Sequence, residues 1–124
     1  LKLRLLNLGH TWLAERWQVD GRDADENVLH AMRDPVLRAS LESLWRDEVL
    51  PVLDALGQGE QARAYLQDVR ERFENPFLDH RLADISRNHE QKKRRRFKPA
   101  VDMARELGLQ IGQPRLSQAL AQCA

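Results

Sequence analysis

Apolar residues along this chain recur at three- and four-residue steps, the spacing that places side chains on one face of an α-helix. No stretch shows the two-residue alternation that is typical of a half-buried β-strand. The pattern predicts an all-α fold, an irregular cluster of about six or seven helices in a single domain over residues 1–124. The clearest predicted core faces are Leu37, Leu41, Leu44, Trp45 and Val49, and Ala62, Tyr65, Leu66, Val69 and Phe73.

Capping residues, prolines and glycines divide this pattern into helices. Asp34 followed by Pro35 is typical of a helix start, because the carboxylate accepts first-turn N–H groups and proline has no N–H to leave unpaired. Gly108 predicts the end of the last long helix. Pro51 and Pro99 predict internal kinks or restarts, and a final turn or short helix follows near Pro114. The predicted helices cover about residues 2–17, 25–32 with Asp25 as cap, 35–55, 60–73, 76–86 and 89–107.

Composition and charge mainly exclude classes of function and location. The net charge of +1 produces no global field that favours nucleic acid or a membrane surface. No apolar run approaches the ~20 residues that span a bilayer, and no signal peptide opens the chain. The single cysteine, Cys123, cannot form an intrachain disulfide, so we expect a reduced, cytoplasmic setting.

The first ten residues combine an amine, an amide and an imidazole in the spacing Lys-x4-Asn-x2-His. On an ideal α-helix, Asn7 lies about 140° and His10 about 80° round from Lys2, so the three line one broad side. Such a set could hold a hydroxyl or carbonyl oxygen and move its proton. Taken singly, each residue is more often structural: a surface lysine, a satisfied amide or a packed histidine.

This spacing resembles the catalytic helix of the long-chain polyol dehydrogenases, a family that includes mannitol dehydrogenase and the hexuronate reductases. Two later stretches support the resemblance: residues 72–76 read Arg-Phe-Glu-Asn-Pro, and Lys92, Arg96 and Pro99 form Lys-x3-Arg-x2-Pro. Residues 47–54 most resemble the tagaturonate reductase (altronate oxidoreductase) branch. The resemblance covers nearly the whole chain but only the C-terminal part of such an enzyme.

The resemblance implies an oxidoreductase that transfers a hydride between NAD or NADP and a sugar acid or polyol, with the tagaturonate/altronate type preferred. Lys2 would be the general base, Asn7 and His10 would stabilise the substrate oxygen, and Lys92 and Arg96 would contact the substrate. The chemistry would need no metal, because the lysine does the work that zinc does elsewhere.

The nucleotide-binding domain that the resemblance implies is not encoded in these residues. The six glycines are scattered, and no Gly-x-Gly-x-x-Gly is present to bring a helix N-terminus to a pyrophosphate. We therefore expect the C-terminal half of a two-domain dehydrogenase, with NAD or NADP bound mainly by an upstream domain. Alone it would be inactive, and its exposed docking surface could let such fragments self-associate.

Three other functions stay open at this point: a dehydrogenase domain for a neutral polyol such as mannitol or arabinitol, a non-enzymatic helical interaction module, and a basic nucleic-acid binder. The last rests on the run at residues 92–96. Helical geometry spreads five consecutive residues all round the axis, so we expect no nucleic-acid partner. We expect Lys93, Arg94 and Arg95 to form a solvated face paired with acids.

The remaining histidines and the tryptophans carry weaker signals. We expect His30 to pack between helices and His80 to have a capping or surface role, although His80 could reach the cleft. His89 departs from the family pattern, which often has a small residue there. None of the histidines has the tight spacing of metal ligands. The residues Trp12, Trp17 and Trp45 are expected in the core, with Trp12 and Trp17 as alternatives for docking to the missing domain.

Overall fold

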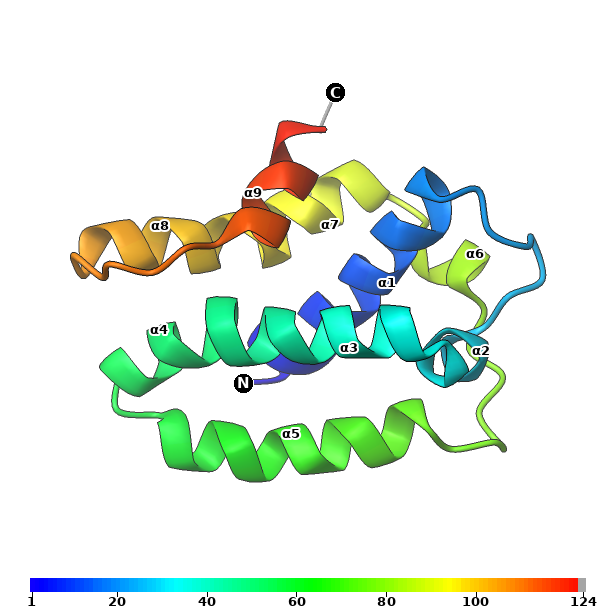
Figure 1. Cartoon of the computed structure of the whole chain (residues 1–124), viewed down its shortest axis with the longest axis horizontal. Helices are drawn as coiled ribbons and strands as arrows, with labels where there is room; N and C mark the ends of the chain where they lie inside the picture. The colour runs from blue at the N-terminus through cyan, green and yellow to red at the C-terminus, as the bar shows by residue number, and fades with distance from the viewer. Residues whose placement is uncertain (123–124) are drawn as a thin grey trace.

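The computed structural model describes residues 1–122, so Cys123 lies outside the described residues. Within that range the chain is helical and contains no β-strand, which confirms the all-α prediction (Figure 1). A single isolated antiparallel bridge joins Asn27 and Arg81. The elements are η1 (Lys2–Asn7), α1 (Leu8–Val19), α2 (Val28–Arg33), α3 (Pro35–Ser43), η2 (Leu44–Val49), α4 (Leu50–Ala55), α5 (Gly59–Phe73), α6 (Leu82–Ile85), α7 (His89–Arg96), α8 (Lys98–Glu106) and α9 (Pro114–Ala121).

Several of these elements join end to end. The π-helix η1 runs into α1, α3 continues through the π-helix η2 into α4, and only Phe97 separates α7 from α8. Figure 1 shows the α3–α4 rod lying alongside α5, with α7, α8 and α9 on its other side. Counted as rods, the described helices number seven, within the predicted six or seven.

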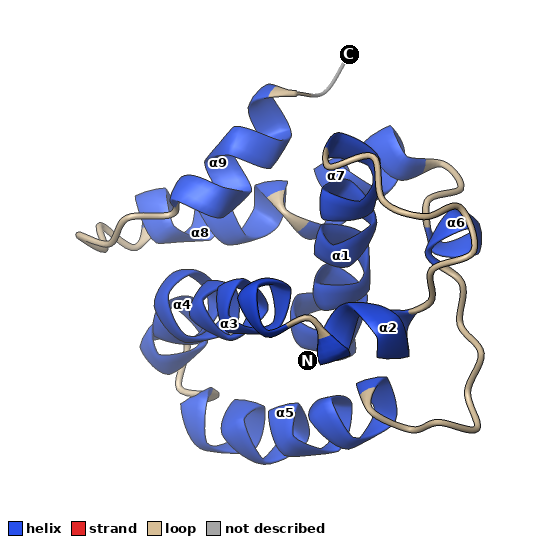
Figure 2. Ribbon diagram, turned by 45° about the vertical axis from the view of Figure 1, so that its right-hand side comes forward, coloured by secondary structure: helices blue, strands red, loops and turns tan. Residues whose placement is uncertain are grey.

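The rod formed by η1 and α1 lies at the centre of the fold. It contacts α2, α3, α5, α6 and α7, and Figure 2 shows α1 between α6 and α3. Its leucines at positions 5, 8 and 13 are completely buried together with Trp45, whose indole N–H donates to the Leu5 carbonyl at 3.2 Å. The helix with the predicted catalytic residues is therefore also the helix around which the core is built.

Pro51 explains one of the two π-helical segments. Proline has no N–H to give to a carbonyl one turn back and its ring crowds that carbonyl, so a regular α-helix cannot run through it. The chain widens into η2 over Leu44–Val49, and α4 then begins with Pro51 in its first turn. The predicted kink or restart at Pro51 is confirmed in this form.

The second helix starts later than the sequence pattern indicates. Asp25 does not cap it: the cap is Asn27, whose side chain accepts from the N–H of His30, while the His30 ring accepts from the N–H of Asn27 at 3.2 Å. His30 is exposed, so the prediction that it packs between helices is wrong. Its imidazole replaces the Glu or Gln of an ordinary capping box.

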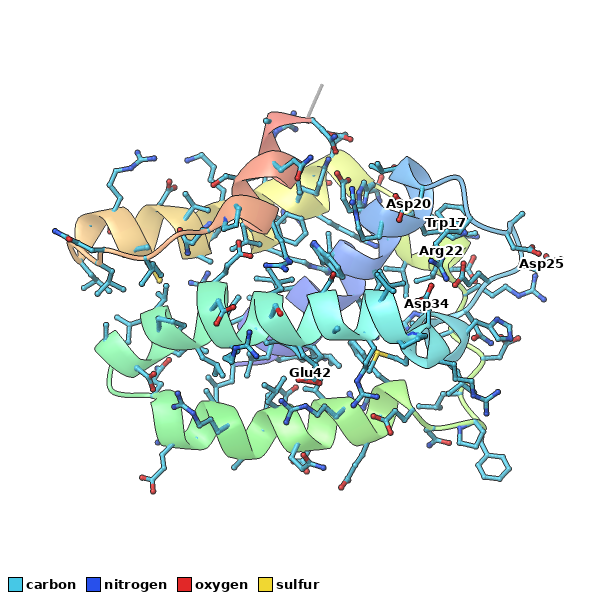
Figure 3. The ribbon with its side chains drawn as sticks, viewed as in Figure 1. Trp17, Asp20, Arg22, Asp25, Asp34 and Glu42 are labelled. Carbon is cyan, nitrogen blue, oxygen red and sulfur yellow. The ribbon has the colours of Figure 1, made fainter. Side chains whose placement is uncertain are left out.

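The loop before α2 is fixed by Arg22 rather than by Asp25. Figure 3 shows Trp17, Arg22 and Asp34 close together, while Asp25 points away from them. The Arg22 guanidinium lies 2.8 Å from Glu26 and 3.0 Å from Asp34, and it lowers the pKa of the Asp34 carboxyl. Asp34 also accepts the N–H groups of Val36 and Leu37, so its predicted role as the α3 cap is confirmed.

The prediction of a helix over residues 76–86 is wrong for most of that range. Residues 76–81 form a turn and extended backbone, and α6 covers only Leu82–Ile85. The Val28 N–H donates to the His80 carbonyl and the Leu82 N–H to the Glu26 carbonyl. These backbone bonds to a distant loop replace the helical bonds that the local sequence favours.

Candidate active site

The three residues of the opening motif lie on the central rod. Lys2 is exposed, and Asn7 and His10 are half-buried. Residues 2–7 are π-helical, so the ideal α geometry inferred from the sequence does not hold there. A π-helix pairs residues five apart, which brings Lys2 and Asn7 closer to one face than the predicted 140°. π-Helical turns occur frequently at functional sites.

His10 is held between two rings. It stacks on Phe73 with ring centroids 4.4 Å apart and an interplanar angle of 12°, and His80 meets it edge-on at 4.8 Å. Burial, together with the positive charge of His80, Arg96, Arg72 and Lys92, lowers the pKa of His10 to about 3. The imidazole is therefore neutral near pH 7, with one ring nitrogen that donates and one that accepts.

A pocket of about 260 Å³ opens beside His10. Its wall is formed by α1, the start of α2, the end of α5 and the loop after Pro76. The lining combines apolar side chains with basic ones and a single acid among the described residues. They are His10, Val28, Arg72, Phe73, Leu78, Asp79 and His80.

Lys92 and Arg96 lie on α7, which packs against α1. The Lys92 ammonium donates to the Ile85 carbonyl at 2.7 Å, and Arg96 donates to the Thr11 hydroxyl at 2.8 Å. Burial lowers the pKa of both groups, helped for Lys92 by the charge of Arg96. The structure thus brings both predicted substrate contacts within electrostatic range of His10, and both already bind a protein oxygen.

The basic run at residues 92–96 is not a solvated face throughout. Lys93 is only 1% exposed, and its ammonium lies 3.0 Å from the Glu15 carboxylate and donates to the Ala119 carbonyl at 3.0 Å. His89 contributes a ring nitrogen 2.9 Å from the same Glu15 oxygen. The prediction that Lys93 is solvated is wrong, and its burial interrupts the surface charge that a nucleic-acid binder would need.

Comparison with known proteins decides the family. The sequence matches the family of the mannitol dehydrogenase C-terminal domain over residues 1–123. The chain belongs to this family. The resemblance inferred from the three motifs is confirmed.

Curated relatives of this mannitol dehydrogenase C-terminal domain include several altronate oxidoreductases. The chain is 38% identical to that of Halalkalibacterium halodurans over 102 residues, which is 82% of this chain and 19% of the relative. It is 33% identical to that of Klebsiella pneumoniae strain 342 and 34% identical to that of Yersinia pestis, each over 120 residues, 97% of this chain and 24% of the relative. No solved structure matches. The chain spans about a fifth to a quarter of the length of these relatives.

A dehydrogenase family implies a nicotinamide cofactor, and the residues of this domain do not fit its pyrophosphate. Residues 1–122 contain no β-strand, and the described glycines are not grouped at the start of a helix in the way that a dinucleotide site requires. In the same range no group of three or more His, Cys, Asp or Glu side chains could hold a metal ion. No helix of the described chain is long and apolar enough to cross a membrane.

For the mannitol dehydrogenase C-terminal domain, sequence reasoning gives Arg72 no role beyond the Arg-Phe-Glu-Asn-Pro motif, and for His80 it prefers a capping or surface role but leaves open that this histidine reaches the cleft. His80 is indeed exposed, yet its ring also contacts His10. The sequence signal was present, because both residues lie within one motif-bearing stretch, but only the fold places that stretch against α1.

Proposed function

We propose that this chain is the catalytic, substrate-binding part of an NAD(P)-dependent oxidoreductase that acts on a sugar acid of the altronate/tagaturonate type. One observation carries the proposal: His10 is neutral and half-buried, lies beside a small pocket, and is within range of the positive charges of Arg72, Lys92 and Arg96. Such surroundings favour a substrate that carries negative charge. The names of the relatives point to the same substrate class.

The proposed proton chemistry uses the opening motif. Lys2 takes the hydroxyl proton when the sugar alcohol is oxidised and returns it in the reverse direction. Asn7 donates its amide N–H to the substrate oxygen, and among residues 1–122 that amide has no protein partner to give up first. Neutral His10 can donate to the same oxygen as charge develops on it, which lowers the barrier by a few kcal/mol per well-placed donor.

Lys92 and Arg96 are proposed to orient the polar end of the substrate. Both are multivalent donors, so each can keep its present acceptor and still bind a substrate hydroxyl or carboxylate oxygen. The nicotinamide supplies or accepts the hydride and would be held by the nucleotide-binding domain that we propose lies elsewhere in the natural protein.

The test measures NADH and NADPH oxidation by the longest natural protein in which this chain occurs, offered tagaturonate, fructuronate or fructose. We expect turnover of a uronate and a fall of at least about a thousandfold in kcat for Lys2→Ala, because the base is lost. Lys98→Ala is the matched control, since Lys98 is an exposed lysine paired with Asp102. Turnover of fructose alone would move the substrate to neutral polyols. No turnover of any substrate, or a Lys2→Ala protein as fast as its parent, would leave the interaction module as the better account.

A further inference from the structure

We propose that the pocket beside His10 is the carboxylate subsite, in which Arg72 and His80 bind the acid end of the substrate. This inference rests on the proposed function and assigns the acid end to residues other than Lys92 and Arg96. In this arrangement Arg72 and His80 bind the acid end of the sugar, Lys92 and Arg96 bind its hydroxyl groups, and both sets lie around His10, which lines the pocket.

Arg72 and His80 have no acidic partner among the described residues. Both are exposed and both line the pocket. Other arginines of the fold are neutralised by acids, for example Arg70, whose guanidinium donates to both oxygens of Glu42, and Arg63, which binds Asp54. An unpaired guanidinium at the mouth of a pocket presents its donors to a ligand, and its fork matches a carboxylate.

The acid in the lining does not cancel this charge. Asp79 accepts from the Asn27 amide at 3.0 Å, and its second oxygen lies 3.9 Å from Arg81. Both carboxylate oxygens therefore already face groups outside the basic pair. The Asp79 carboxylate instead ties the loop to α2, which holds His80 in place against His10.

Lys92 and Arg96 are less free than the pocket residues. Each already donates to a protein oxygen, the Ile85 carbonyl at 2.7 Å and the Thr11 hydroxyl at 2.8 Å. These bonds fix both side chains between α7 and its neighbours. Lys92 and Arg96 are therefore suited to bind substrate hydroxyl groups near the reacting carbon. Arg72, which has no acidic partner in the described part of the chain, is suited to bind the charged carboxylate.

The size and the walls of the pocket fit one end of a small acid. Its volume of about 260 Å³ is below the ~300 Å³ at which sites for whole drug-sized ligands begin. Val28, Phe73 and Leu78 supply an apolar wall, and partial removal of water by such side chains strengthens the attraction between a carboxylate and Arg72. The imidazole of His10, stacked on Phe73, lines the same pocket.

The experiment measures equilibrium binding of altronate and of altritol, its uncharged analogue, to the longest natural protein by titration calorimetry. We expect Arg72→Gln to weaken altronate binding by roughly ten- to a hundredfold and to leave altritol binding within about threefold, because only altronate carries the charge. His80→Gln should give a smaller loss with the same selectivity. Arg105→Gln, at an exposed arginine on α8, is the matched control and should change neither.

Binding without turnover separates this inference from the proposed function. Selective loss of altronate binding in Arg72→Gln supports the subsite even in a protein that oxidises no sugar. Equal effects on altronate and altritol, unchanged altronate binding, or an inability of the parent to bind altronate would each overturn it. Partial recovery in Arg72→Lys, which keeps the charge without the fork, would further support a carboxylate as the ligand.

Discussion

At the scale of single residues, His10 shows how the fold sets the state of a side chain. Its ring lies flat on Phe73 and edge-on to His80, in a place where burial and nearby cations both oppose a second proton. A neutral ring can accept from a substrate hydroxyl and can also donate to an oxyanion, whereas an imidazolium can only donate. We infer that the basic neighbours also keep His10 uncharged, besides attracting an anionic substrate.

The depressed pKa of His10 predicts that the domain loses stability in mild acid. Below about pH 6.5 the unfolded chain protonates this histidine, and the folded chain resists protonation until about pH 3. Stability should therefore fall as the pH drops through this window, by at most about 1.4 kcal/mol per pH unit from this group. Urea unfolding near pH 7 and near pH 5 measures the loss.

The variant His10→Phe should lose less stability than its parent between these two pH values, because phenylalanine keeps the stack on Phe73 and cannot titrate. Arg105→Gln, at an exposed arginine on α8, is the control and should keep the parent's pH dependence, because arginine stays charged throughout this range. Identical pH dependence in His10→Phe and the parent would show that His10 titrates normally in the folded state.

At the scale of elements, the sequence predicted the boundaries that depend on local chemistry. Asp34 starts α3 and Gly108 follows the end of α8 with a φ of +67°, because a cap and a positive φ need only neighbouring residues. The start of α2 escaped prediction, since a histidine stands in the capping box where Glu or Gln is expected. The loop after Pro76 escaped it as well, because its backbone pairs with α2 far away in the sequence.

The close approach of α1 to its neighbours depends on Gly9. A Cβ atom there would lie 2.9 Å from the Trp45 ring and 3.3 Å from the Phe73 ring. We expect overpacking in Gly9→Ala to destabilise the domain by about 1–3 kcal/mol. The higher helix propensity of alanine should offset up to ~1 kcal/mol of this loss. Thermal or urea unfolding measures the difference.

Gly112→Ala provides the control for that substitution, because its added Cβ meets nothing closer than Pro114 at 3.8 Å. We expect it to change stability by less than about 1 kcal/mol. A Gly9→Ala protein as stable as its parent would mean that Trp45 and Phe73 shift without cost, and that the glycine is not needed for packing.

At the scale of the whole molecule, one buried charge cluster joins three helices. Glu15 on α1 accepts from Lys93 and lies against His89, both on α7, while Lys93 also donates to the Ala119 carbonyl on α9. One Glu15 oxygen and one His89 nitrogen are buried without a hydrogen-bond partner. The sequence could not identify Lys93 among five consecutive basic residues, because its partner lies 78 positions away.

Breaking this cluster should cost far more than breaking a surface ion pair. We expect Lys93→Met to destabilise the domain by about 3–5 kcal/mol, because Glu15 keeps its buried charge and loses its main partner. Lys98→Met removes the exposed pair with Asp102 and should cost less than about 1 kcal/mol. Equal unfolding midpoints for the two variants would show that Glu15 becomes neutral or hydrated at little cost.

The π-helical turn of residues 2–7 also bears on how related sequences are aligned. Such a turn uses more residues per revolution than an α-helix, so it can be regarded as an α-helix with one residue inserted. A relative with one residue fewer between its lysine and asparagine could keep the leucine core of α1 and still turn its lysine by about 100°. In an alignment that change would be a single gap in a well-matched helix, and in the molecule it would move the proposed base away from Asn7 and His10.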